Sequence, residues 1–122
     1  MIYSDELIYI EIEPSEIPWL KIFTHTPHKE FSDCNSSEKL TILNALDIIE
    51  KEMISYFNPI KINIASFGNM LPRVHWHIMA RFESDDYFPN PMWGEKIRSG
   101  FALGQPMEPF LDNLSKKLAN LE

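Results

Sequence analysis

The sequence predicts an α+β domain with a largely antiparallel sheet, one long central helix and a C-terminal helix. Two observations support this class. The apolar patterns follow the order strand, strand, helix, strand, strand, helix, which lacks the regular alternation of a parallel α/β sheet. The length of 122 residues and the apolar fraction of 44% fit one globular domain, so we expect residues 1–122 to form a single domain.

The first elements predict a β-hairpin. Residues 6–13 are rich in β-branched and aromatic types, and three isoleucines recur at every second position. A short turn with two prolines follows, and residues 19–23 predict a second strand that pairs with the first. Residues 24–34 show no periodicity and predict a loop.

The central helix has clear start and stop signals. Asn35 and Glu38 have the spacing of a capping box, and Asn58 before Pro59 marks the end of the helix. Apolar side chains recur between them at steps of three and four residues, which predicts one buried face. This predicted core face contains Leu43, Leu46, Ile49, Met53 and Phe57.

The second half predicts another hairpin and a last helix. Residues 60–67 and 74–82 alternate as strands, and Gly68 with Asn69 predicts the turn between them. Residues 83–105 are long for a connection in a compact domain, and such segments often cover a site. The apolar stripe that follows, down to Leu121, predicts an amphipathic helix with its two prolines in the first turn.

Charge and cysteine content disfavour several classes of function. The 11 basic and 18 acidic residues give a net charge of −7, which repels nucleic acids over long range. Cys34 is a single cysteine and cannot form an intrachain disulfide. No apolar run approaches the about 18 residues of a membrane span, and the N-terminus does not resemble a signal peptide. We therefore expect a soluble cytoplasmic protein without nucleic-acid or membrane partners.

The strongest chemical signal is a polar row on the last predicted strand. Residues two apart on a strand share a face, so Arg73, His75 and His77 are expected on one face and Trp76 on the apolar other. Packing alone does not favour two imidazoles and a guanidinium in one row, because each needs a polar partner when buried. A neutral imidazole can attack phosphorus. A guanidinium binds anions but cannot release a proton, which favours phosphate binding by Arg73.

Residues 73–79, Arg-Val-His-Trp-His-Ile-Met, resemble the signature of the histidine triad superfamily, His-φ-His-φ-His-φ-φ with φ apolar. Gly68 and Asn69 precede it where family members carry glycine and an amide residue. The Trp93–Gly94 loop and the His-Trp-His core look most like bacterial members related to dinucleoside polyphosphate hydrolases. Arg73 departs from the pattern, because the family has its first histidine there.

The resemblance implies a nucleotide hydrolase or nucleotidyl transferase that acts at an α-phosphate and forms a homodimer. His75 would be the covalent nucleophile and His77 a phosphate contact, while Arg73 and Asn69 would bind substrate. The acidic residue that binds ribose would be Glu11 or Glu13. The departure at Arg73 keeps open a non-catalytic module that binds nucleotides and has lost turnover.

The remaining chemical candidates have simpler readings. His75 and His77 could bind a metal together with loop residues His25, His28 and Cys34, but the spacing matches no closed zinc pattern, and we expect neither metal nor cofactor. The adjacent Asp85 and Asp86 are expected on the solvated surface. Trp76 is expected in the core, and Trp93 either on a lid or against a partner chain.

Overall fold

The computed structural model describes residues 1–121 and confirms an α+β fold with an antiparallel sheet. The strands are β1 (Tyr3–Ser4), β2 (Ile8–Ile12), β3 (Trp19–Thr24), β4 (Lys61–Ala65) and β5 (His75–Arg81). They form one sheet in the order β1-β2-β3-β5-β4, and every neighbouring pair is antiparallel. The helices are the short 3₁₀ turn η1 (Phe31–Asp33), α1 (Ser36–Phe57) and α2 (Met107–Leu118).

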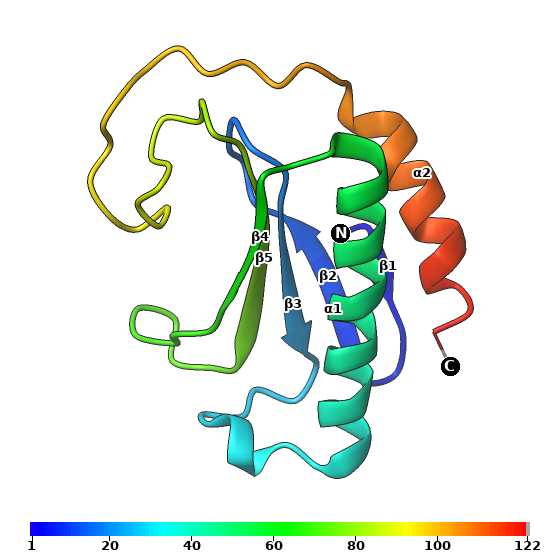
Figure 1. Ribbon diagram of the computed structural model, residues 1–122. Helices are drawn as coiled ribbons and strands as arrows, with labels where there is room; N and C mark the ends of the chain where they lie inside the picture. The colour runs from blue at the N-terminus through cyan, green and yellow to red at the C-terminus, as the bar shows by residue number, and fades with distance from the viewer. Residues whose placement is uncertain (122) are drawn as a thin grey trace.

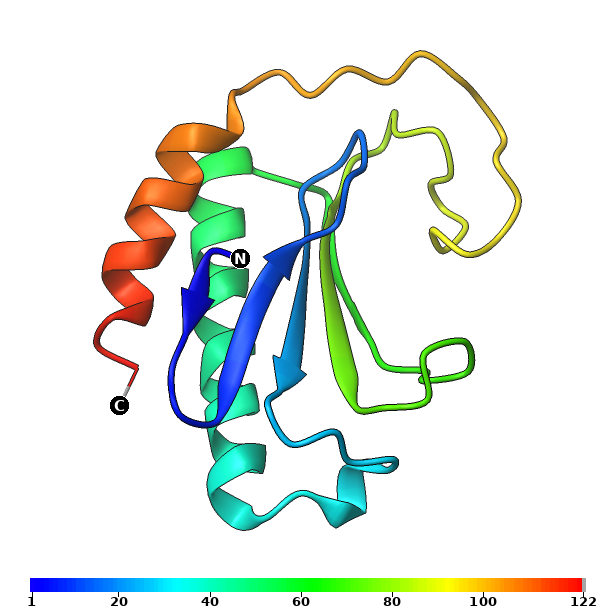
Figure 2. The same cartoon turned by 180° about the vertical axis from the view of Figure 1, so that it is seen from behind.

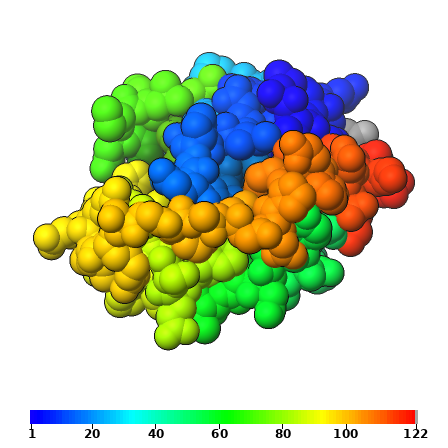
Figure 3. All heavy atoms as spheres, turned by 90° about the horizontal axis from the view of Figure 1, so that it is seen from above, coloured from blue at the N-terminus to red at the C-terminus, as the bar shows by residue number. Residues whose placement is uncertain are grey.

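The two faces of the sheet have different neighbours. Figure 1 shows α1 along one face, with α2 beside α1, while residues 66–74 and 82–105 extend from the opposite side. The reverse view in Figure 2 shows the same division. Seen from above in Figure 3, the yellow and orange segment crosses this end of the molecule to reach α2. Helices thus cover one face of the sheet, and loops border the opposite face.

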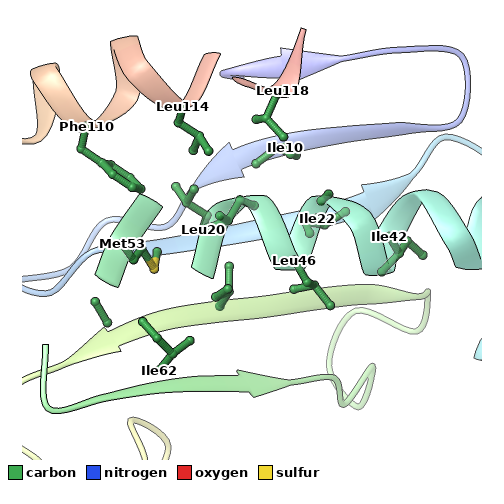
Figure 4. Packing of buried hydrophobic residues seen from close by; sticks show 14 of the residues in the cluster. Ile10, Leu20, Ile22, Ile42, Leu46, Met53, Ile62, Phe110, Leu114 and Leu118 are labelled. Atoms are coloured by element: carbon green, nitrogen blue, oxygen red, sulfur yellow. The ribbon is translucent and has the colours of Figure 1, made fainter. Parts of the chain in front are cut away.

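The core fills the space between the helices and the sheet. Figure 4 shows Phe110, Leu114 and Leu118 of α2 directed toward α1 and β2, where they meet side chains such as Ile10. Isoleucines at alternate positions of the strands complete this layer because they share the helix-facing side of the sheet. The core therefore consists of residues from both hairpins and both helices.

The helix boundaries follow from local hydrogen bonds. Asn35 and Glu38 form the predicted capping box, with each side chain accepting from the other's backbone N–H at 2.8 Å. Asn58 ends α1 in the left-handed conformation, with φ of 49°, which asparagine tolerates better than most residues. Within residues 1–121, no helix is long and apolar enough to cross a membrane.

Two sequence predictions need correction. The sequence places Leu43 in the core, but it is 55% exposed, because Ile42 and Ala45 occupy the buried face of α1 at its level. The strand β1 was not predicted, since two residues are too few to show a period. Neither difference changes the architecture.

Candidate functional site

The polar row of β5 lies on the sheet face opposite the helices. His75 and His77 alternate with Trp76 and Ile78, and the latter belong to or pack against the helix-side core. On the neighbouring strand β3, Phe23 stands opposite His75 and Lys21 opposite His77. Both imidazoles are largely buried, each with 8% of its surface exposed. The alternation predicted for residues 75–81 is therefore observed.

His75 is oriented by two contacts. Its Nδ1 lies 2.9 Å from the carbonyl oxygen of Arg73, and because a carbonyl only accepts, Nδ1 carries the proton and donates. The ring also stacks on Phe23, with centroids 5.3 Å apart and planes inclined by 17°. Nε2 is consequently the nitrogen with a free lone pair.

His77 has the opposite tautomer. The indole Nε1–H of Trp19 can only donate, and it donates to His77 Nδ1 at 3.0 Å, so the ring proton resides on Nε2. Burial lowers the pKa of His77 to about 4, with help from His75 and Lys21 nearby. Near neutral pH His77 is uncharged, and its Nε2–H is a hydrogen-bond donor.

The two histidines lie at the base of a cavity of about 530 Å³. One side is formed by residues 67–71, which include Asn69, and the other by Trp93. Gly68 turns this segment with φ of +70°, a conformation that side chains disfavour. The predicted phosphate ligand Asn69 and the two histidines thus line one cavity, which is large enough for a small organic phosphate.

An ion pair completes the lining. Lys21 Nζ lies 2.8 Å from Glu13 Oε1, and both side chains border the cavity. Of the two acidic residues considered for ribose binding, Glu13 lines the cavity and Glu11 does not. Sequence reasoning missed Lys21, although its position on the strand paired with β5 could be inferred from alternation with Phe23.

Arg73 has a different position from that expected. It lies before the first residue of β5 and does not line the cavity. Its guanidinium donates to the carbonyl of Thr24 and sits 5.7 Å from the ring centroid of Phe23, the ring that stacks on His75. Arg73 thereby joins the end of β3 to the start of β5, and its role in substrate binding stays a prediction.

Trp93 closes the cavity over His77. Its ring lies edge-on to His77 at 4.8 Å, to Trp19 at 5.2 Å and to Phe67 at 4.7 Å between centroids. These contacts fit the predicted lid, and the alternative role of Trp93 against a partner chain stays a prediction. The segment that carries Trp93 follows Arg81, which lies on the same face of β5 as His75, His77 and Met79.

Asp85 is not on the surface, which corrects the sequence prediction. It is 1% exposed and pairs with Arg81, with Oδ2 2.9 Å from Arg81 Nε. Burial opposes ionisation, but hydrogen bonds from Arg81 and from the backbone N–H groups of Phe82, Phe88 and Tyr87 outweigh it and lower the pKa of this carboxyl. Asp86 is also buried, at 7% exposure. The sequence does contain a signal for this burial. Alternation along β5 places Arg81 on the same buried face as His75 and His77, and a buried arginine requires an acidic partner such as Asp85.

The five residues considered as an alternative metal set do not come together in one place. His28 and Cys34 lie beside Glu38, and within residues 1–121 this trio is the single cluster whose ligand atoms come close enough to share an ion. His25 instead hydrogen-bonds to Ser4, with Nε2 3.1 Å from Oγ. The histidines of β5 are therefore separate from these loop residues.

Comparison with known proteins finds similar solved structures but no matching sequence. No family model and no curated protein sequence matches this chain. Among solved structures, a histidine triad protein from Bradyrhizobium japonicum is similar with a TM-score of 0.77 and 23% identity, covering 95% of this chain and 87% of that one. A histidine triad protein from Sinorhizobium meliloti 1021 follows with a TM-score of 0.72, 23% identity, and coverage of 98% and 87%.

A third solved structure, from an archaeon, is similar at lower sequence identity. It is described as a hypothetical histidine triad nucleotide-binding protein from Sulfolobus tokodaii, with a TM-score of 0.59 and 11% identity, and the match covers 98% of this chain and 80% of that protein. These similarities, the sheet order and the paired histidines of β5 agree with the resemblance seen in the sequence. The chain therefore has the histidine triad fold.

Proposed function

We propose that the protein binds a small nucleoside phosphate conjugate in the cavity and cleaves it at the α-phosphate through His75. The observation that carries this proposal is the tautomer of His75. The hydrogen bond from Nδ1 to the Arg73 carbonyl leaves Nε2 with a free lone pair, and Nε2 belongs to a cavity that is also lined by Asn69 and His77. The nucleotide-binding description of the archaeal structure supports the ligand class.

The chemical steps follow from these tautomers. The Nε2 lone pair of His75 forms a bond to phosphorus, and the bond to the leaving group breaks, with its electron pair and a solvent proton on the departing atom. Water then attacks phosphorus and loses a proton to solvent, and the nitrogen–phosphorus bond breaks with its electron pair returning to His75 Nε2, which releases a nucleoside monophosphate. An alcohol or amine in place of water makes the protein a transferase.

Other cavity residues have roles suited to their chemistry. The Nε2–H of His77 and the side-chain amide of Asn69 donate to phosphate oxygens. The Glu13 carboxylate accepts from ribose hydroxyls, while Trp93 and Phe67 provide aromatic surface for the base. The Lys21 ammonium, whose charge is balanced by Glu13 at 2.8 Å, is a further donor toward a phosphate oxygen.

A non-catalytic nucleotide-binding module is the alternative, and one observation favours it. The leaving group requires a proton, but Arg73 cannot release one and the pKa of His77, at about 4, makes it a poor reservoir at neutral pH. Incubation with a nucleoside phosphoramidate separates the two functions. Release of nucleoside monophosphate supports the enzyme, whereas saturable binding without release supports the module.

The decisive variant is His75→Ala. It should reduce product release by about 10³-fold or more, because the attacking nitrogen is lost, while nucleotide binding persists. Mass spectrometry of acid-quenched wild-type protein should detect a nucleotidyl adduct that the variant lacks. His25→Ala is the matched control, since His25 lies outside the cavity. Activity of His75→Ala within a few-fold of wild type would exclude the covalent mechanism.

We also infer a cytoplasmic homodimer. β4 is the last strand of the sheet, so its outer edge has no partner strand within the described residues, and Ile54, Ile60 and Ile64 are exposed near it. A second copy could cover this edge and its apolar surroundings. Light scattering at micromolar concentration should give twice the chain mass, and a monomer mass alone would contradict the inference.

A further inference from the structure

A second cluster of reactive side chains lies where the segment after β3 meets the start of α1. His28 comes from that segment, Cys34 follows η1, and Glu38 belongs to the first turn of α1. His28 Nε2 lies 2.9 Å from Glu38 Oε2, and the ligand atoms of all three residues are within 4.8 Å of one another. Nitrogen, sulfur and carboxylate oxygen thus converge on one point.

The donor set fits a zinc ion. Zn²⁺ prefers imidazole nitrogen, thiolate sulfur and carboxylate oxygen, and tetrahedral coordination places such atoms roughly 3.5 Å apart. The observed separations therefore need only small side-chain movements to surround an ion. A thiolate and a carboxylate together neutralise the two positive charges of Zn²⁺, which suits a site of low solvent exposure.

Burial distinguishes this cluster from an ordinary surface group. Cys34 and Glu38 are each 4% exposed, while the His28 side chain is 20% exposed and borders solvent. The exposed side at His28 leaves room for a water molecule as the fourth ligand.

We propose that His28, Cys34 and Glu38 bind one Zn²⁺ ion at a site separate from the cavity at His75. One backbone hydrogen bond and one ring contact connect this site to β5 and the residue before it. The amide of Val74 donates to the His28 carbonyl at 2.8 Å, and the ring of Phe31 lies 5.5 Å from that of Trp76. The ion would thus fix the segment before α1 against the residues that lead into the strand of the two histidines.

The test uses the full chain without a histidine tag, stripped of metal and titrated with Co²⁺ and then Zn²⁺. One equivalent of Co²⁺ should produce a thiolate-to-cobalt charge-transfer band in the near ultraviolet, and Zn²⁺ should abolish it by competition. Zn²⁺ should also raise the melting temperature, because it binds the folded state. These readouts are independent of any nucleotide chemistry.

Three variants identify the ligands. Cys34→Ser should abolish the charge-transfer band, and Cys34→Ser, His28→Asn and Glu38→Gln should each weaken Zn²⁺ binding by about 100-fold. Glu38→Gln is suitable because a glutamine oxygen can still accept from the Asn35 backbone and preserve the helix cap. His25→Asn is the control from the same loop and should bind like wild type.

The proposal has clear contrary outcomes. Co²⁺ binding without a charge-transfer band, or an unchanged zinc affinity in both Cys34→Ser and His28→Asn, would overturn it. Loss of zinc binding in His75→Asn with retention in His28→Asn would assign the ion to the β5 histidines instead. Circular dichroism of each metal-free variant verifies that reduced affinity does not arise from unfolding.

Discussion

The two walls of the cavity are built differently. The glycine wall, residues 66–74, is bonded at its two ends, where Ser66 Oγ donates to the His75 carbonyl at 2.7 Å and the Val74 amide donates to the His28 carbonyl at 2.8 Å. Between these ends, Met70 is 98% exposed. The tryptophan wall, residues 82–105, begins at the buried Arg81–Asp85 pair. Arg81 additionally donates to Asn63 Oδ1 at 2.8 Å and to the Asn90 carbonyl at 2.7 Å. The tryptophan wall is therefore fixed by a buried ion pair, whereas the glycine wall is bonded at its ends and exposed between them.

The two walls also have different roles in the proposed function. The tryptophan wall holds Trp93 against His77, so the tautomer and burial of that imidazole are set before a ligand arrives. The glycine wall brings Asn69 and exposed apolar side chains that a ligand can cover on binding. Loops with few buried contacts are the parts of a protein that open most readily.

The largest effect is expected from breaking the fixed wall with Asp85→Asn. The substitution leaves the buried Arg81 without its carboxylate and weakens the acceptor for three backbone amides. We expect the free energy of unfolding to fall by about 3 kcal/mol, as for other broken buried pairs. Urea unfolding followed by circular dichroism measures the change.

The matched control is Asp47→Asn, which removes an exposed pair with Lys51 on α1. Exposed pairs of this kind contribute less than about 1 kcal/mol. Equal losses in the two variants would mean that the Arg81–Asp85 pair does not anchor the tryptophan wall. Faster proteolysis within residues 82–105 of Asp85→Asn would locate its effect in that wall.

A smaller effect concerns pH and the histidine under the fixed wall. The folded-state pKa of His77, about 4, lies below the value of 6.5 for a free histidine, so the unfolded chain binds the proton more tightly between these values. Stability should therefore fall as pH decreases from 6.5 to about 4, with a slope of up to about 1.4 kcal/mol per pH unit from this group.

Comparison with His77→Phe isolates this contribution. The variant lacks the titrating ring, so its unfolding free energy should depend less steeply on pH over the same range. Chemical denaturation at several pH values gives both slopes. Identical slopes for the two proteins would show that Trp19 and Trp93 do not hold His77 in its neutral form.

The smallest effect on stability is expected from Met70→Ala in the glycine wall. Because the side chain is almost fully exposed, the unfolding free energy should change by less than about 0.5 kcal/mol. Nucleotide affinity, measured by calorimetry, should fall by several-fold if a ligand covers this side chain. A loss of stability comparable to that of Asp85→Asn would remove the distinction between the walls.

The sequence predicts the framework better than the surroundings of the site. Alternation on β5 and the capping box at Asn35 are local patterns, so the histidine pair and the start of α1 could be predicted. The direction of Arg73 could not, because alternation applies only within a strand and β5 begins at His75. The contact of Trp93 with His77 depends on a long segment folding back, which no local period encodes.

The positions of the three tryptophans allow ligand binding to be followed by intrinsic fluorescence. Trp19 and Trp93 meet edge-on beside His77, so a nucleotide that enters the cavity should alter their emission. Trp76 lies on the other face of the sheet, where it contacts Phe31 of η1, three residues before Cys34 of the proposed zinc site. Single-tryptophan variants would thus report phosphate ligands and metal ions through separate fluorescence signals, without any added dye.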